Sequence, residues 1–395
     1  MMGSAAFADV TAPDIWADWK GYLEGSGYSV TADESQSGNT LSVSNITLGI
    51  AIVVDDPDMI VSIGDMTFVE TGDGTVSVEI PPEMTMDVEM DGPGDEDFAA
   101  RIDYLTTGFE MIASGDPNAV TYDYSSDGSV MQLGDITAAG QTIDLGTFKV
   151  SVADLAGQTQ MKVGNIREAE QTLSSGAVTY NIDFADPENP DARIVLNGAM
   201  AGLEATGTSL LPLQMDAADV AGALAEGFSV DANLAYRDNA MDFEFTEAGQ
   251  TTQGSTSSAT GAVVVKMSES GLLYDVSTTQ TNVAMAGGEI PLPVEFALEE
   301  SGFNLTMPIS EGDAEQDFAL GFKMGNFTMS DLLWGLFDPS GQLPRDPATI
   351  DIDLTGKAKL FFDLMDPEAM VDAETSGETP GELNALDVNL SLIHI

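Results

Sequence analysis

The stretch Met84-Thr85-Met86-Asp87-Val88-Glu89-Met90 places an apolar and a polar side chain at alternate positions. Successive side chains of a β-strand point to opposite faces, so this stretch predicts a strand with one apolar and one acidic face. Strands of this kind are typical of antiparallel sheets that are wet on one side. The same alternation recurs at residues 180–184, 230–236, 241–245 and 350–354.

Turn residues fall between the alternating stretches. Thr71-Gly72-Asp73-Gly74 and Arg237-Asp238-Asn239 each separate two apolar stretches. Gly and Asn tolerate the positive φ of tight hairpins, so both segments are interpreted as turns. Short strands at close spacing predict a mainly β (α+β) fold, a long antiparallel meander of strands in curled or packed sheets.

Three short helices are expected to interrupt the strands. The first begins after the capping residue Thr11, carries Pro13 in its first turn and ends at Gly25. The second covers residues 217–226 with Asp216 as its cap, and the third covers residues 331–337 with Ser330 as its cap. Helices divided by blocks of strands favour two β-rich lobes. These are 9–210 with the N-terminal helix and 211–389 with two short helices, joined near Leu211-Pro212.

The two ends of the sequence carry signals of another kind. Ala6-Phe7-Ala8 fits the small-residue pattern of a secretory cleavage site, so residues 1–8 are interpreted as a signal-peptide remnant. The last six residues, 390–395, read Leu-Ser-Leu-Ile-His-Ile. They resemble the translation of a common transposon-derived sequencing adapter, and the alternative is a natural final strand. The adapter hypothesis predicts a truncated chain in which His394 is not native.

Composition excludes several functions. The 395 residues hold 66 Asp and Glu against 12 Lys and Arg, a net charge of -54, which argues against nucleic-acid binding and against docking on anionic membranes. There is no cysteine, and His394 is the single histidine, so thiol and Ser-His-Asp catalysis are not expected. The longest apolar run, residues 48–54, is too short to cross a bilayer, so the mature chain is predicted to be soluble, without a transmembrane segment.

Acidic clusters offer the nearest approach to a chemical site. Residues 55–58 and 91–97 are rich in Asp and Glu and could hold calcium, but neither has the ligand spacing of a calcium loop, so a solvated turn is the preferred interpretation. Glycoside hydrolysis needs two carboxylates, and 66 acids supply suitable pairs by chance. The sequence therefore predicts a protein that is not an enzyme, with no catalytic, cofactor-binding or metal-binding residues.

Two other features remain open between a structural and a functional role. Many of the 20 methionines fall on apolar strand positions, where they either fill gaps in a core or line a groove for varied apolar ligands. Arg345 is expected to hold its own loop through Asp338, Asp346 or Asp331, and the alternative is a contact to a ligand anion. The inward methionines are Met84, Met86, Met241, Met307 and Met324.

Several motifs carry a family resemblance. Residues 331–339, Leu343-Pro344-Arg345-Asp346-Pro347 and residues 353–358, together with the opening at Ala8–Thr11 and Trp16, resemble domain of unknown function 2125. The resemblance runs from about Asp9 to Asn389. It implies an exported alphaproteobacterial protein that usually continues beyond this point. Because the family has no established activity, the resemblance assigns no site residues.

These features combine into one functional hypothesis. The chain is predicted to be a non-enzymatic, exported protein of the periplasm and cell envelope that binds an apolar, lipid-like ligand in a groove of its β-sheet. One alternative is a purely structural or interaction protein of the envelope, and a less favoured one is a carbohydrate-acting enzyme. An open apolar groove would favour the first, a filled core the second, and a pocket with convergent acids the third.

Overall fold

The computed structural model describes residues 9–50, 59–90, 97–187, 189, 191–216 and 219–394. The predicted signal-peptide remnant, the acidic residues 55–58 and nearly all of the acidic segment 91–97 lie outside the described residues. The chain divides into two units, which are described separately. Unit 1 comprises residues 1–189 and 211–217, and unit 2 comprises residues 190–210 and 218–395.

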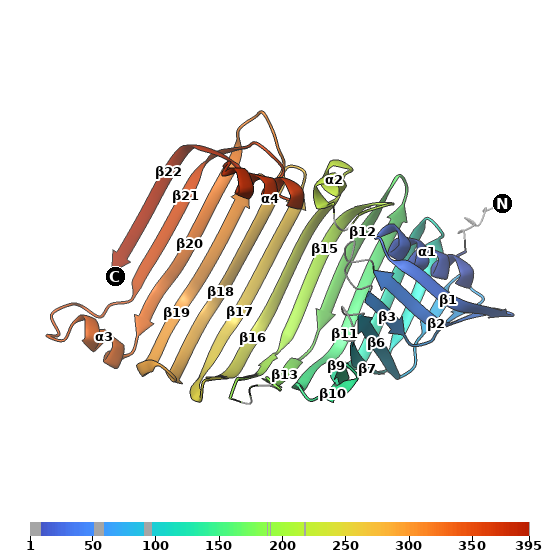
Figure 1. The fold of residues 1–395 in the computed structure, drawn as a ribbon, viewed down its shortest axis with the longest axis horizontal. Helices are drawn as coiled ribbons and strands as arrows, with labels where there is room; N and C mark the ends of the chain where they lie inside the picture. Colours follow the sequence, from blue (N-terminus) through green and yellow to red (C-terminus); the bar gives the residue numbers. More distant parts are fainter. Residues whose placement is uncertain are drawn as a thin grey trace, which may run out of the picture. The chain divides into compact units, whose positions relative to one another are not determined.

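The prediction of a mainly β fold with a few short helices is confirmed, and the strands of each unit pair antiparallel (Figure 1). Unit 1 begins with helix α1, Ala12–Gly25, and continues with strands alone. Its strands are β1 Ser29–Ser37, β2 Thr40–Ile50, β3 Met59–Ile63, β4 Met66–Glu70, β5 Val76–Glu79, β6 Glu83–Met90, β7 Phe98–Thr107, β8 Glu110–Asp116, β9 Ala119–Ala138, β10 Gln141–Ile143, β11 Gly146–Val163, β12 Ile166–Ser175 and β13 Val178–Ala185.

Helix α1 forms where the sequence predicts it and packs into the core of unit 1. The Thr11 hydroxyl accepts from the Asp14 amide, and the Asp14 carboxylate accepts from the Thr11 amide, which is a capping box. Trp16 and Trp19 lie against Phe68 of β4, with ring centroids 6.1 and 5.4 Å apart. Phe68 is fully buried, so the helix and the strands around it close an apolar core.

A buried ion pair fastens α1 to the sheet of unit 1. Asp18 Oδ1 lies 2.6 Å from Arg167 Nη1 on β12, and both side chains are 8% exposed. The Tyr122 hydroxyl donates to Asp18 Oδ2 at 3.0 Å. Burial and the adjacent Asp18 carboxylate raise the pKa of Tyr122, because both disfavour the tyrosinate. The charges therefore stabilise one position of the helix, since removing either partner would strand a buried charge.

Unit 2 is a meander of long strands with three short helices. From β16 to β22 each strand pairs with the next one along the chain, and β14 and β15 pair in succession with β16. Its strands are β14 Arg193–Met200, β15 Gly202–Pro212, β16 Ser229–Glu247, β17 Gln250–Ser268, β18 Gly271–Gly287, β19 Ile290–Met307, β20 Gln316–Met329, β21 Ala348–Leu360 and β22 Gly381–His394.

The helices of unit 2 correct two sequence-based predictions. Helix α2, Val220–Ala225, is shorter than predicted and is capped by Asp219, whose side chain accepts from the Gly222 amide, rather than by Asp216. Helix α3, Asp331–Phe337, begins after Ser330 as predicted, although the Ser330 side chain makes no capping bond. Helix α4, Pro367–Ser376, was not predicted, although Asp366 caps it and Gly377 ends it in the left-handed conformation.

The predicted turn at Arg237-Asp238-Asn239 is wrong, because β16 runs through it. Asp238 has a φ of 50°, and the pairing with β17 keeps one register on both sides of it. Gln280 of β18 and Asn326 of β20 also have φ values of 50°. Extending the registers places Asp238, Gln280 and Asn326 in one transverse line across the sheet. Asp and Asn adopt positive φ more readily than most residues, and the strand pairing continues past the line, so the line marks a bend rather than a hairpin.

The division into units differs from the predicted lobes 9–210 and 211–389. Strand β14 and most of β15 belong to unit 2, because both pair with β16. Residues 211–216 belong to unit 1, where the Met215 amide donates to the Gly25 carbonyl at 2.7 Å. At the other end, residues 390–394 continue β22 against β21, and the adapter hypothesis stays a prediction about the nucleotide sequence.

Candidate functional site

One row of residues across unit 2 shows how the strand alternation is used. Directly paired residues of antiparallel strands share a face, and every member of this row is apolar. The neighbouring row, one residue along each strand, faces the other way and is mostly polar. The apolar row is Ala205, Leu234, Val263, Val276, Phe303, Phe322, Ile352 and Leu390. The neighbouring row is Thr206, Asn233, Val264, Asp275, Asn304, Gly321, Asp353 and Asn389.

The apolar face continues beyond the bend at Asp238, although the alternation changes there. Before Asp238 the apolar residues of β16 have even numbers, such as Leu234, and after it they have odd numbers, such as Phe243. Tyr236 belongs to the even-numbered set of β16, and its hydroxyl lies 3.1 Å from the hydroxyl of Ser258 on β17. Ser258 pairs with Asn239, which belongs to the odd-numbered set of β16, so Ser258 shares the face of that set. The two sets therefore share one face, because a residue in the left-handed region shifts the alternation by one position.

We call this surface the apolar face. It consists of Val230, Ala232, Leu234 and Tyr236 before the bend, Met241, Phe243 and Phe245 after it, and the residues paired with them across the strands. Aromatic rings lie across glycines of the next strand: a Cβ at Gly261 would collide with the Tyr236 ring, and one at Gly254 with the Phe243 ring. Glycine at these positions lets the rings lie flat along the sheet.

Much of the apolar face is left exposed by the rest of unit 2, although Leu298 at the bend is buried. Leu234, Phe303 and Phe322 expose 38, 38 and 43% of their surface, and Leu390 exposes 67%. Helices α2 and α4 lie near one end of the long strands and α3 near the other, rather than over the middle of the sheet (Figure 1). An exposed apolar surface larger than a few hundred Å² usually marks a binding site, so this face is the main functional candidate.

The predicted methionines divide between the two units. Met241, Met307 and Met324 lie on the apolar face, paired with Gly198, Leu272 and Ser301. Met84 and Met86 lie on β6 of unit 1, where they pair with Tyr104 and Ile102. The sequence alternation thus placed three of the five on the candidate surface, but it did not show that this surface is left uncovered.

The loop after α3 is held by its own charges. Arg345 forms an ion pair with Asp331, one of the three partners predicted for it. Asp338 is buried and accepts from the Leu343 amide at 2.7 Å, and this backbone bond holds the pKa of its carboxyl below the ordinary value. The hydroxyl of Ser330, which precedes α3, and the indole Nε1 of Trp334 on α3 are buried without a hydrogen-bond partner. Arg345 therefore ties the loop back to the first residue of α3.

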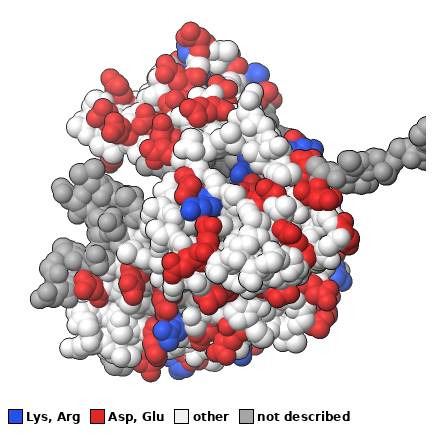
Figure 2. Space-filling view, turned by 90° about the vertical axis from the view of Figure 1, so that its right-hand side faces the viewer, with Lys and Arg blue, Asp and Glu red and all other residues white. Residues whose placement is uncertain are grey.

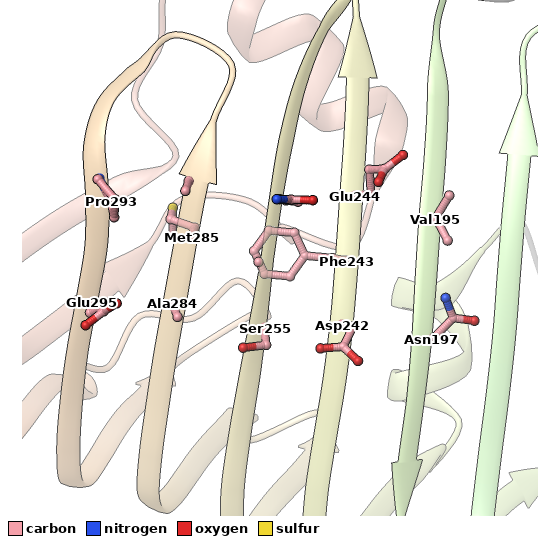
Figure 3. A pocket seen from close by; sticks show the side chains of 13 residues that line it. Val195, Asn197, Asp242, Phe243, Glu244, Ser255, Ala284, Met285, Pro293 and Glu295 are labelled. Carbon is pink, nitrogen blue, oxygen red and sulfur yellow. The ribbon is translucent and has the colours of Figure 1, made fainter.

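The opposite face of unit 2 carries a hollow of about 500 Å³. Figure 3 shows Asn197, Asp242, Ser255 and Glu295 in one row across the strands, with Glu244 beside them. A second hollow of about 820 Å³ adjoins it and is lined by small residues such as Ala240 and Ser257. Within the described residues, no three acidic or histidine side chains are grouped closely enough to hold a metal ion. Both hollows are open to solvent, and the first is bordered by acidic side chains, so they are weaker candidates for an apolar ligand.

Acidic residues far outnumber basic ones on the surface that Figure 2 shows, in agreement with the net charge of -54. Among the described residues, no helix is long and apolar enough to cross a membrane. Comparison of the chain with models of protein families, with curated proteins and with solved structures found no match. The resemblance to domain of unknown function 2125 therefore stays a prediction.

Proposed function

We propose that this chain is a non-enzymatic, exported protein of the bacterial envelope that binds a lipid-like ligand on the apolar face of unit 2. The observation that supports the proposal is the apolar row through Leu234, Phe303 and Leu390, which crosses eight strands and remains partly exposed. A periplasmic location rests on the sequence pattern at Ala6-Phe7-Ala8.

A contact of moderate size with this face would give useful affinity. A ligand that removes about 400 Å² of apolar surface from water gains about 10 kcal/mol. The loss of translational and rotational freedom costs at least about 4 kcal/mol. The remaining 6 kcal/mol or so correspond to a dissociation constant of tens of micromolar, roughly, and a larger contact would bind more tightly. A reversible carrier fits this range.

The alternative is a structural role in which another protein covers the apolar face. This role predicts a stable complex and no bound lipid, whereas a carrier keeps the face accessible to small ligands. The acidic surface favours the carrier, because repulsion between like charges opposes a second copy of the chain and also keeps the protein away from anionic membranes. A carbohydrate-acting role would need a cleft with a catalytic pair of acids, and the acids near Asp242 lie in an open hollow.

Titration with the neutral dye Nile red tests the proposal. The wild-type chain should bind the dye saturably at micromolar concentration, and lipid extraction of gently purified protein should yield bound lipid. Phe303→Glu places a charge in the apolar row and should weaken dye binding by about tenfold or more, since it leaves a charge against the ligand.

Ser277→Glu is the matched control for that variant. Ser277 lies on the neighbouring strand β18, is exposed and belongs to the opposite face, because it pairs with Gly302. The Ser277→Glu substitution adds the same charge to the same sheet and should leave dye binding unchanged. Equal losses in both variants, or no saturable binding by the wild type, would contradict a ligand site on the apolar face.

A further inference from the structure

The apolar face contains a band of hydroxyl groups along the bend, which we call the hydroxyl seam: Tyr236, Ser258, Thr278, Thr281 and Ser301. Thr278 Oγ1 lies 2.7 Å from Thr281 Oγ1 and 2.6 Å from Ser301 Oγ. Tyr236 and Ser258 form a separate pair. Five hydroxyls hold five O–H donors, and the three bonds among them use three, so two donors remain, together with spare lone pairs.

A similar band of hydroxyl groups occurs in unit 1, but its side chains are more deeply buried than those of the hydroxyl seam. There Thr106, Ser126 and Ser129 are 7, 3 and 7% exposed and bond to one another through Ser126. In the hydroxyl seam Ser258 is buried, whereas Tyr236, Thr278, Thr281 and Ser301 are only half-buried. The seam of unit 2 is therefore reachable by a ligand on the apolar face.

The seam divides the apolar face into two arms. On β16, Val230 to Tyr236 lies on one side and Asn239 to Phe245 on the other. Each arm is six residue steps long, which at about 3.3 Å per residue is about 20 Å. A ligand that matches this surface carries hydrogen-bond acceptors near its middle and an apolar chain on each side.

Charge narrows the choice of ligand further. In the rows through Leu234, Tyr236 and Phe243, every described member of the apolar face is uncharged, while the net charge of the chain is -54. No basic side chain in these rows could pair with a carboxylate or a phosphate, and the surrounding field repels anions. A hydrocarbon would cover the two seam donors without accepting from them, which is unfavourable.

We propose that the apolar face binds a neutral diacyl lipid, with its ester carbonyls on the hydroxyl seam and its acyl chains along the two arms. This assignment rests on the proposed function and names its ligand class. Ester carbonyls accept hydrogen bonds without carrying charge, so they match the two remaining donors and the lack of basic side chains.

Displacement of Nile red from the full chain tests the assignment with three competitors delivered from cyclodextrin. Dioleoylglycerol has the esters and no charge, dioleoyl phosphatidate has the same esters and a phosphate, and squalane has neither. Dioleoylglycerol should displace the dye at about tenfold lower concentration than either of the others, as expected for two added hydrogen bonds and for the absence of anion repulsion.

The triple variant Thr278→Val/Thr281→Val/Ser301→Ala removes one whole hydrogen-bonded group of the seam, and with it one of the two remaining donors. It should bind squalane somewhat more tightly and lose about fivefold of the preference for dioleoylglycerol, as expected for one lost hydrogen bond. Tyr274→Phe is the control, since Tyr274 lies on the same face beside Phe303 and outside the seam, and it should keep the preference. Equal displacement by all three competitors, or an unchanged preference in the triple variant, overturns the diacyl assignment and leaves the lipid-binding proposal standing. No Nile red binding by the wild type overturns both.

Discussion

Units 1 and 2 are built from the same kind of alternating strand, but among the described residues the main cluster of buried apolar side chains lies in unit 1. In unit 1 the buried cluster joins Ile15 and Trp16 of α1 to Phe68 of β4 and Tyr122 of β9. In unit 2 the corresponding surface, through Leu234 and Phe322, is about 40% exposed. The two units differ in the helices available to cover the sheet. Helix α1 has fourteen residues and an apolar side, whereas α2, α3 and α4 have six, seven and ten and lie near the strand ends (Figure 1).

The comparison shows that alternation determines the two faces of a sheet but not what lies on them. A buried apolar face stabilises its own unit, and an uncovered one is available for binding. Substitutions at matched positions in the two units should therefore have unequal effects on stability, and each of the following predictions tests that difference.

The largest effect is expected for a fully buried aromatic residue. Phe68→Ala should lower the free energy of unfolding of unit 1 by about 3–5 kcal/mol, because it leaves a cavity under Trp16 and Trp19. Phe322→Ala in unit 2 should cost about 1 kcal/mol, since its side chain is 43% exposed. Urea unfolding followed by hydrogen exchange of peptides from each unit measures both. Equal losses would mean that the apolar face is covered in solution.

The next largest difference in stability between the two units is expected when an ion pair is broken. Asp18→Ala should cost about 3 kcal/mol, because it leaves Arg167 buried without a partner. Asp231→Ala removes the matched pair with Lys266 on unit 2, where the side chains are 41 and 51% exposed, and should cost less than about 1 kcal/mol.

The double variant Asp18→Leu/Arg167→Met serves as the control for the first pair. It removes both charges together and should recover most of the lost stability, since neither charge is stranded. Failure to recover would show that packing, rather than charge, makes Asp18 important.

The local signals of the sequence predicted some elements of the fold and missed others. The alternation at 241–245 and the cap at Thr11 predicted a strand and a helix, because both depend on neighbouring residues only. Helix α4 had the same local signals in Asp366 and Gly377 and could have been found. The bend at Asp238 was mistaken for a turn, because Asp tolerates positive φ in both settings.

The candidate site was less predictable than the strands. The inward position of Met241 follows from its neighbours, but the exposure of Phe322 depends on whether any distant segment covers it. The hydroxyl seam depends on pairing between strands, since Tyr236 and Ser258 are 22 residues apart. Such contacts come from tertiary structure, and the local sequence carries no signal for them.

A third effect concerns pH and is expected in unit 1 alone. The pKa of Tyr122 is raised in the folded state by burial and by Asp18, so the folded unit keeps a proton that the unfolded chain loses near pH 10. Stability should be unaffected by this group below that pH and should fall by about 1.4 kcal/mol per pH unit above it. The difference between wild type and Tyr122→Phe in urea unfolding at pH 9, 10 and 11 isolates this group. A constant difference would show that Tyr122 ionises normally.

The smallest change in stability is expected for glycine substitutions at the bend, which occurs in both units. Gln280 has a φ of 50° in the middle of β18, where glycine has no steric penalty. Gln280→Gly should therefore stabilise unit 2 by about 0.5–1 kcal/mol, while Thr279→Gly at the next position should destabilise it by a similar amount. Asp154 occupies the equivalent position on β11 of unit 1, with a φ of 48°, and Asp154→Gly should have the same sign. Thermal unfolding of the three variants measures the changes. Destabilisation by all three would mean that these residues have ordinary strand conformations, and the apolar residues on the two sides of Asp238 would then face opposite ways.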